Sequence, residues 1–215
     1  MKTDNRPVIV KPVSLSEQAY EIIKEEIITN RIKAGEILTE EQLASRLNIS
    51  RTPIRTALKQ LVLEHLAEVN ENKNVVVSNI TAEDVKNVCA VRKALEPLAV
   101  ELITDPAVEK KTKELRKTIK AQKAAKTHEE FLSEEYNFHM GIASLAKNSF
   151  LYDMIDKTNI MIKRYLILSG TLDKHSDEAL SEHEAILDCL EKKDFPAARD
   201  ALKLHLSNVE ERMFL

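Results

Sequence analysis

Three histidines and one glutamate stand where a helical pattern turns side chains inward. Glu135 and His139 are four residues apart and share an apolar stripe of a predicted helix. His183 and His205 each lie on the apolar stripe of a later predicted helix. Burying a carboxylate and three imidazoles is costly unless they are hydrogen-bonded or coordinate a metal. These residues therefore predict either a hydrogen-bonded polar core or a metal site.

A second set of residues that could bind a ligand lies at the start of a helix predicted from residue 50 to about residue 65. Arg51 and Arg55 are four residues apart and share a face, next to Ser50 and Thr52. A helix start offers N–H groups to phosphate, and the fork of arginine matches O6 and N7 of guanine. The alternative is a solvated basic face, but the capping pattern, the preceding helix and the following hairpin favour DNA contact.

The charge of the whole chain does not indicate a general polyanion binder. The net charge is −3, and residues 1–80 hold 11 basic and 11 acidic side chains. Between Gln42 and Leu63, however, the chain has four basic residues and no acidic one. DNA binding is therefore expected to depend on this local stretch and not on overall charge.

The elements that position the two arginines form a recognisable order. Residues 1–13 are expected to be an arm, and residues 14–78 a DNA-binding domain. In this domain a first helix reaches about residue 30, a short second helix follows Thr39, and the helix capped by Ser50 is the third. Two short strands, 67–69 and 75–77, flank a turn-prone tip. This order predicts a winged helix-turn-helix, followed by a linker at residues 79–81.

The remainder, residues 82–215, has only helical patterns. Short polar or proline-bearing breaks separate six predicted helices, which favour an antiparallel bundle; they cover residues 82–103, 107–126, 129–147, 149–170, 176–193 and 195–213. The fold class is therefore mainly α, with an N-terminal winged helix-turn-helix and a C-terminal six-helix bundle. No apolar run approaches the roughly 20 residues of a membrane span, so we expect a cytoplasmic protein without a membrane partner.

The stretch at residues 50–58 resembles the recognition helix of GntR-superfamily repressors, and the resemblance extends over residues 15–80. It implies that Arg51, Thr52 and Arg55 contact DNA, with Ser50 and Lys73 toward phosphate. The chain departs from the family pattern at Glu41, where some relatives carry a DNA-contacting arginine. It also has Asn72-Lys73-Asn74 in the wing, where relatives often place glycine.

The C-terminal half resembles the FCD-type ligand-binding domain of the same superfamily. The matching pattern is Glu135-x-x-Phe138-His139, Asn148 after this helix, and then His183 and His205. In that family an Asp and three His hold a divalent metal, so the resemblance implies a metal site here with Glu135 in place of Asp. Zinc, nickel, manganese and iron all suit such ligands.

The same resemblance points to an effector next to the metal. We expect a small carboxylate that occupies open metal positions and is bound by Arg92, which shares an inward stripe with Leu95 and Ala99. Asn148 and Arg164 are further candidate effector-binding residues. The alternative for Arg92 is a surface ion pair with Glu96.

Three functions compete at this point. The first is an effector-controlled regulator, a repressor, that binds an inverted-repeat operator in double-stranded DNA as a homodimer. The second is a metal-dependent hydrolase that uses the Glu/His3 site, although the sequence has no HExxH motif. The third is an architectural DNA-binding protein in which the histidines are core residues.

Overall fold

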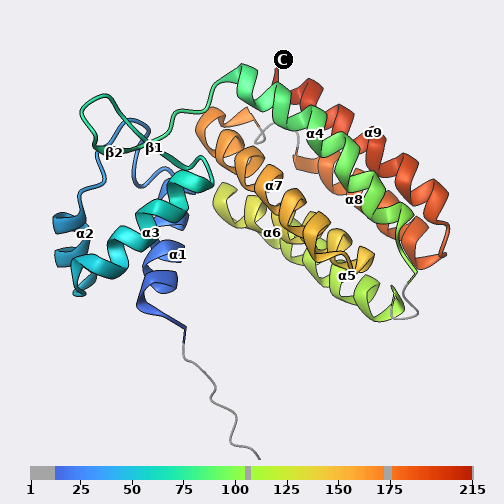
Figure 1. Cartoon of the computed structure of the whole chain (residues 1–215). Coiled ribbons are helices and arrows are strands. Elements are labelled where there is room, and N and C mark those ends of the chain that lie inside the picture. Colours follow the sequence, from blue (N-terminus) through green and yellow to red (C-terminus); the bar gives the residue numbers. More distant parts are fainter. Residues whose placement is uncertain (1–12, 105–107, 172–175, 215) are drawn as a thin grey trace, which may run out of the picture. The chain divides into compact units, whose positions relative to one another are not determined.

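The computed structural model describes residues 13–104, 108–171 and 176–214, and helices dominate it (Figure 1). The mainly α fold class is therefore confirmed. The chain divides into two compact units, with the boundary between Asn79 and Ile80. The predicted linker lies at this boundary. Apart from residue 13, the predicted N-terminal arm lies outside the described residues.

From residue 13 onward, the first unit contains three helices and one hairpin. The helices are α1 (Leu15–Ile28), α2 (Glu40–Leu47) and α3 (Arg51–Leu63), and the antiparallel strands are β1 (Ala67–Val69) and β2 (Val75–Val77). Thr39 begins α2 by accepting a hydrogen bond from the Gln42 N–H at 3.3 Å. Asn48 ends α2 in the left-handed region, at φ 53°. This unit is the predicted winged helix-turn-helix.

The core of this unit is made from the apolar stripes of its helices. On α3, Ile54, Ala57 and Leu61 are buried, and on α1 Ile23 and Ile27 are buried as well. The polar residues at the start of α3 are all exposed. The period of 3.6 residues thus leaves the proposed base-reading face of α3 in solvent.

The second unit contains six α-helices within its described residues. They are α4 (Ala82–Glu101), α5 (Val108–Ala124), α6 (His128–Ala143), α7 (Ser149–Ser169), α8 (Ser176–Glu191) and α9 (Phe195–Met213), with a short 3-10 turn, η1 (Ser144–Ala146), after α6. Each helix packs on the next in the order α4, α9, α8, α5, α6, α7, and α7 packs on α4. The six helices therefore form a closed ring around a shared interior.

The helix ends of this unit follow local chemistry. Thr81 and Asp84 form a capping box at the start of α4. Asn148 caps α7 by accepting from the Leu151 N–H at 3.0 Å. Gly170 ends α7 at φ 64°, a conformation that glycine adopts without strain.

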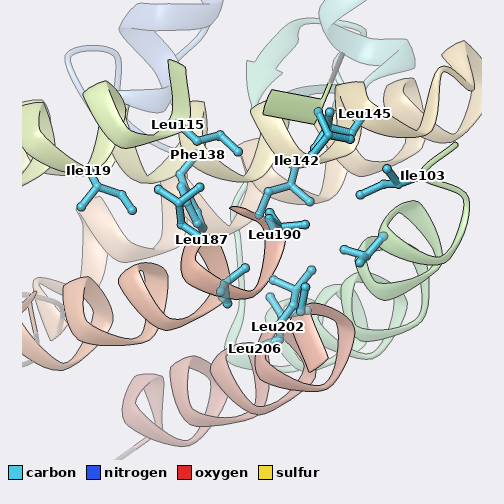
Figure 2. Packing of buried hydrophobic residues seen from close by; sticks show 14 residues of the cluster. Ile103, Leu115, Ile119, Phe138, Ile142, Leu145, Leu187, Leu190, Leu202 and Leu206 are labelled. Atoms are coloured by element: carbon cyan, nitrogen blue, oxygen red, sulfur yellow. The ribbon is translucent and has the colours of Figure 1, made fainter. Parts of the chain in front are cut away.

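The apolar side chains of five helices, α4, α5, α6, α8 and α9, meet in one cluster in the ring interior (Figure 2). Leu115 of α5, Phe138 of α6, Leu187 of α8 and Leu202 of α9 are all buried in this cluster. Phe138 also stacks on the His183 ring, with centroids 4.1 Å apart. The apolar cluster therefore adjoins the polar residues predicted from the sequence. Among the described residues, no helix combines the length and hydropathy of a bilayer span.

Candidate functional site

The exposed start of α3 carries two arginines that are paired with carboxylates of α2. Arg55 donates through Nε and Nη2 to the two carboxylate oxygens of Glu40, both at 2.7 Å. Arg51 Nη2 lies 3.1 Å from Glu41 Oε1. Both arginine side chains are 61% exposed, and the bond to Arg55 is the main reason that the pKa of Glu40 is lowered. DNA must therefore compete with these carboxylates for the arginine forks.

The start of α3 differs from the sequence prediction in one respect. Ser50 occupies the N-cap position with extended backbone angles, but its side chain makes no capping hydrogen bond. Ser50 therefore holds the predicted N-cap position, but its side chain does not contribute to capping. Ser50 and Thr52 are both exposed next to the two arginines.

The hairpin tip places Lys73 at a strained position. The side chain of Asn70 accepts from the N–H groups of Asn72 and Asn74, both at 3.0 Å, and Lys73 has φ 62°. Glycine or asparagine takes this conformation more readily than lysine. The Asn70 bonds instead fix the turn so that the lysine does, which holds the Lys73 backbone at the tip of the wing.

In the second unit, Glu135, His139, His183 and His205 are brought together. Each offers one ligand atom, and these four atoms lie within 4.8 Å of one another. The Nε2 atom of His205 is 3.2 Å from Nε2 of His139 and 3.3 Å from Nε2 of His183. Nitrogen ligands about 2.1 Å from one metal ion are separated by such distances. The three histidines are fully buried, and Glu135 is 6% exposed.

The opposite nitrogen of each imidazole contacts a hydrogen-bond acceptor. Nδ1 of His139 lies 2.6 Å from Glu96 Oε2, and Nδ1 of His205 lies 2.7 Å from Glu182 Oε2. Nδ1 of His183 lies 3.0 Å from the side-chain oxygen of Gln122. Gln122 is held in this orientation because its Nε2 donates to Glu135 Oε2 at 2.8 Å. An Nδ1–H that donates outward leaves the Nε2 lone pair free for a metal.

The protonation equilibria of the cluster follow from burial and charge. Burial, above all, lowers the pKa of His205 to about 3, so this imidazole is neutral at pH 7. Burial would raise the pKa of Glu135, but His183 and His139 outweigh it and hold the pKa well below its usual range. Burial would lower the pKa of His139, but Glu96 reverses the shift and raises it. Because its pKa is raised, His139 is the imidazole at which protons compete most with a metal.

The predicted effector residues have different surroundings. Arg92 is only 3% exposed and donates through Nε to Glu96 Oε1 at 2.5 Å, so the alternative of a surface pair was wrong. Asn159 also donates to Glu96 Oε1, at 2.9 Å. Arg164 is 2% exposed, and burial lowers its pKa. Asn148 is exposed and caps α7, so the structure does not bring it to the cluster.

The sequence reasoning missed four polar residues that contact the cluster or extend its hydrogen-bond network. Gln122 could have been found, since it follows Leu115 and Ile119 on the inward stripe of α5. Glu96 was considered only as an ion-pair partner of Arg92, and Asn159 and Glu182 gave no comparable signal, because the bonds that tie all three to this network join different helices.

Comparison with known proteins finds a matching family for each of the two units. The model of bacterial regulatory proteins of the gntR family matches residues 15–77, and the FCD domain model matches residues 87–208. The HTH-type transcriptional regulator YdhC of Bacillus subtilis is 30% identical over 92% of this chain and 90% of its own length. The HTH-type transcriptional repressor RspR of Escherichia coli is 24% identical over 92% of this chain and 88% of its own length.

The fold is also that of solved regulator structures. The Escherichia coli protein McbR/YncC superposes with a TM-score of 0.78 at 23% identity, over 94% of this chain and 98% of its own. The curated relatives are regulators of transcription and not enzymes, which excludes the hydrolase hypothesis. The chain belongs to the GntR family of bacterial regulatory proteins, as a transcriptional regulator with an N-terminal helix-turn-helix and a C-terminal FCD domain.

Proposed function

We propose that this regulator represses transcription from an operator, and that a small carboxylate bound on a divalent metal in the FCD domain controls its DNA affinity. The observation that carries the proposal is the convergence of four buried ligand atoms, three of them imidazole nitrogens whose opposite ring nitrogens face acceptors. A core that needed only internal hydrogen bonds would have no reason to point three Nε2 atoms at one another.

The proposed DNA contacts are made by α3 and the wing. Arg51 and Arg55 read guanine in the major groove, and Thr52 and Ser50 contact the backbone at the helix start. Lys73 contacts phosphate from the hairpin tip. Replacing either arginine by alanine should weaken operator binding at least about fivefold and relax base preference, whereas Lys73→Ala should weaken all sequences alike. Unchanged operator affinity in the Arg51→Ala/Arg55→Ala double variant would remove α3 from the interface.

The proposed metal ligands are Glu135, His139, His183 and His205. Three nitrogens and one oxygen suit zinc, nickel, manganese or iron. Because Gln122 donates to Oε2 of Glu135, coordination through Oε1 alone is favoured. Four protein ligands then leave about two positions open on a six-coordinate ion.

The charge around the cluster favours an anionic effector. Three carboxylates and two guanidinium groups surround the imidazoles, so the group carries one net negative charge while the histidines are neutral; these are Glu96, Glu135, Glu182, Arg92 and Arg212. A divalent cation reverses this to one net positive charge. A carboxylate would then restore neutrality in a buried site, where unpaired charge is costly.

Arg92 is the proposed partner of the effector carboxylate. Glu96 accepts from its Nε atom, so the Nη edge of the guanidinium fork is the part that an effector would engage. Arg164 is a second candidate because it is a buried cation on α7, the helix that packs on α4. Asn148 is left out, since its side chain caps α7. The two effector residues would couple α4 and α7 to ligand binding.

We further propose a homodimer on an inverted-repeat operator, in the cytoplasm where that DNA lies. Val91 and Leu98 of α4 and its C-cap residue Leu102 are 48%, 39% and 38% exposed and follow one another at helical spacing. An apolar stripe of this kind can meet its own copy across a two-fold axis. Sedimentation equilibrium of Leu98→Glu should show a shift toward monomer, and an unchanged mass would exclude this surface.

The experiment that tests the proposal is a carboxylate screen on zinc-loaded protein by thermal shift, followed by release from operator DNA selected from a random library. Gluconate is a rational first ligand, because one relative is the gluconate operon transcriptional repressor of Bacillus subtilis, 25% identical over 91% of this chain. The best hit should lose affinity in Arg92→Lys and in metal-stripped protein. Arg116→Lys, a change in an exposed ion pair on α5, is the matched control. Equal binding to all four proteins would contradict the mechanism.

A further inference from the structure

Glu182 lies next to His183 on α8, yet its carboxylate is bonded entirely to α9. Its Oε2 accepts from His205 Nδ1 at 2.7 Å and from Arg212 Nη2 at 2.8 Å. Its Oε1 accepts from Asn208 Nδ2 at 2.7 Å and from Arg212 Nη1 at 2.9 Å. The three donors are separated by three and four residues, so they lie along one face of α9.

These four bonds fix the carboxylate more firmly than a surface ion pair would. Each oxygen has two donors, and the guanidinium of Arg212 binds in the bidentate geometry that sets direction as well as distance. The Glu182 side chain is 19% exposed and that of Arg212 is 14% exposed. Because Arg212 stays protonated, the Glu182 carboxylate stays ionised and can only accept hydrogen bonds. His205 must then carry its proton on Nδ1.

We propose that Glu182 is a positioning residue that holds His205 in the tautomer with the proton on Nδ1 and aims its Nε2 lone pair at the metal. Arg212 and Asn208 hold Glu182 in the orientation that this requires. The inference rests on the proposed metal site, and it adds an acidic partner that the four ligand positions do not include. Removal of such partners lowers metal affinity by about 10- to 100-fold in other proteins.

The three imidazoles are not equivalent in this arrangement. His205 and His139 donate to the carboxylates of Glu182 and Glu96, whereas His183 donates to the neutral amide of Gln122. A carboxylate partner makes an imidazole more basic and a stronger metal ligand. Glu182 and Glu96 therefore strengthen two of the three nitrogen ligands, and His183 is the weakest of them.

The test is Glu182→Gln, which keeps the shape but replaces one acceptor oxygen by a donor. In metal-free protein, nitrogen–proton correlation spectra of the imidazoles report the tautomer of each histidine. Zinc affinity is measured by competition with a chromophoric chelator. We expect His205 to lose its single Nδ1–H tautomer and zinc affinity to fall by about 10- to 100-fold.

Two further variants make the outcome decisive. Glu184→Gln changes an exposed glutamate on the other side of His183 and should alter neither measurement. Arg212→Lys keeps the charge but loses the bidentate grip, so it should give a smaller loss in the same direction even if Glu182→Gln fails to fold. The inference would be overturned if, in the folded variants, His205 stayed protonated on Nδ1 and zinc affinity stayed within twofold of wild type. If wild type itself binds no zinc, the proposed metal site fails, and the tautomer alone decides the role of Glu182.

Discussion

Arg92 and Glu96 form a buried ion pair whose disruption should have a large effect. The side chains are 3% and 1% exposed, and Nε lies 2.5 Å from Oε1. Arg92→Met keeps the aliphatic stem but leaves the Glu96 carboxylate without its guanidinium. Breaking a buried pair by removing one partner costs about 3–5 kcal/mol. Glu96 keeps its bonds to His139 and Asn159, so we expect the lower end, about 3 kcal/mol.

The assay is urea unfolding of metal-free protein followed by circular dichroism, with thermal melting as a second measure. For a protein of this length, a loss of 3 kcal/mol corresponds to a Tm lower by about 6–12 °C. Lys113→Met, which disrupts an exposed pair with Glu109, is the control and should leave both measures unchanged.

The double variant Arg92→Met/Glu96→Gln gives the sharpest check on the charge argument. Glutamine removes the uncompensated negative charge, so the double variant should be more stable than Arg92→Met alone. A loss below about 1 kcal/mol in Arg92→Met, or a double variant that is less stable than Arg92→Met, would refute the reasoning.

Three further predictions concern other parts of the chain. Gly141→Ala should lower the free energy of unfolding by about 1–3 kcal/mol, because the added Cβ would lie 2.5 Å from Leu115 Cδ2; urea unfolding with unchanged stability would contradict this. Glu41→Gln should tighten binding to non-specific DNA at low salt, since it frees Arg51 from its 3.1 Å ion pair, and unchanged fluorescence anisotropy titrations would count against it. Below pH 4.5 the wild type should lose stability more steeply than Glu182→Gln. Burial would raise the pKa of Glu182, but the bonds from His205 and Arg212 outweigh it and lower the folded-state pKa from 4.5 to about 2. The stabilisation by the Glu182 carboxylate is therefore present above pH 4.5 and is lost as the pH falls toward 2. Parallel curves of stability against pH for the two proteins would disprove this prediction.

Much of the architecture could be predicted because it depends on local chemistry. Thr39, Thr81 and Gly170 mark helix ends through capping and backbone preference, and the apolar period of α3 separates buried Ile54 from exposed Arg55. The inward stripes of α6, α8 and α9 likewise predicted which histidines are buried. Patterns within one helix therefore determined both the elements and the four clustered residues.

The rest depended on contacts between helices, which one sequence does not reveal. The inward stripe of α4 predicted that Arg92 points into the bundle, but the bonds of Glu96 to His139 and Asn159 depend on how α4 packs in the ring. Glu182 is next to a predicted ligand but acts on His205, 23 residues away. At the wing, the bonds from Asn70 determine that Lys73 takes the positive φ. The sequence could predict which side chains are buried, but not which side chains on other helices they bond to.

The central claim is tested most directly by the metal content of purified protein after dialysis against zinc, nickel, manganese or iron. Elemental analysis should find about one divalent ion per chain in wild type and almost none in the His183→Ala/His205→Ala variant, because two of the four converging ligand atoms are then gone. A wild type that retains none of the four metals, or a double variant that retains as much as wild type, would contradict the account.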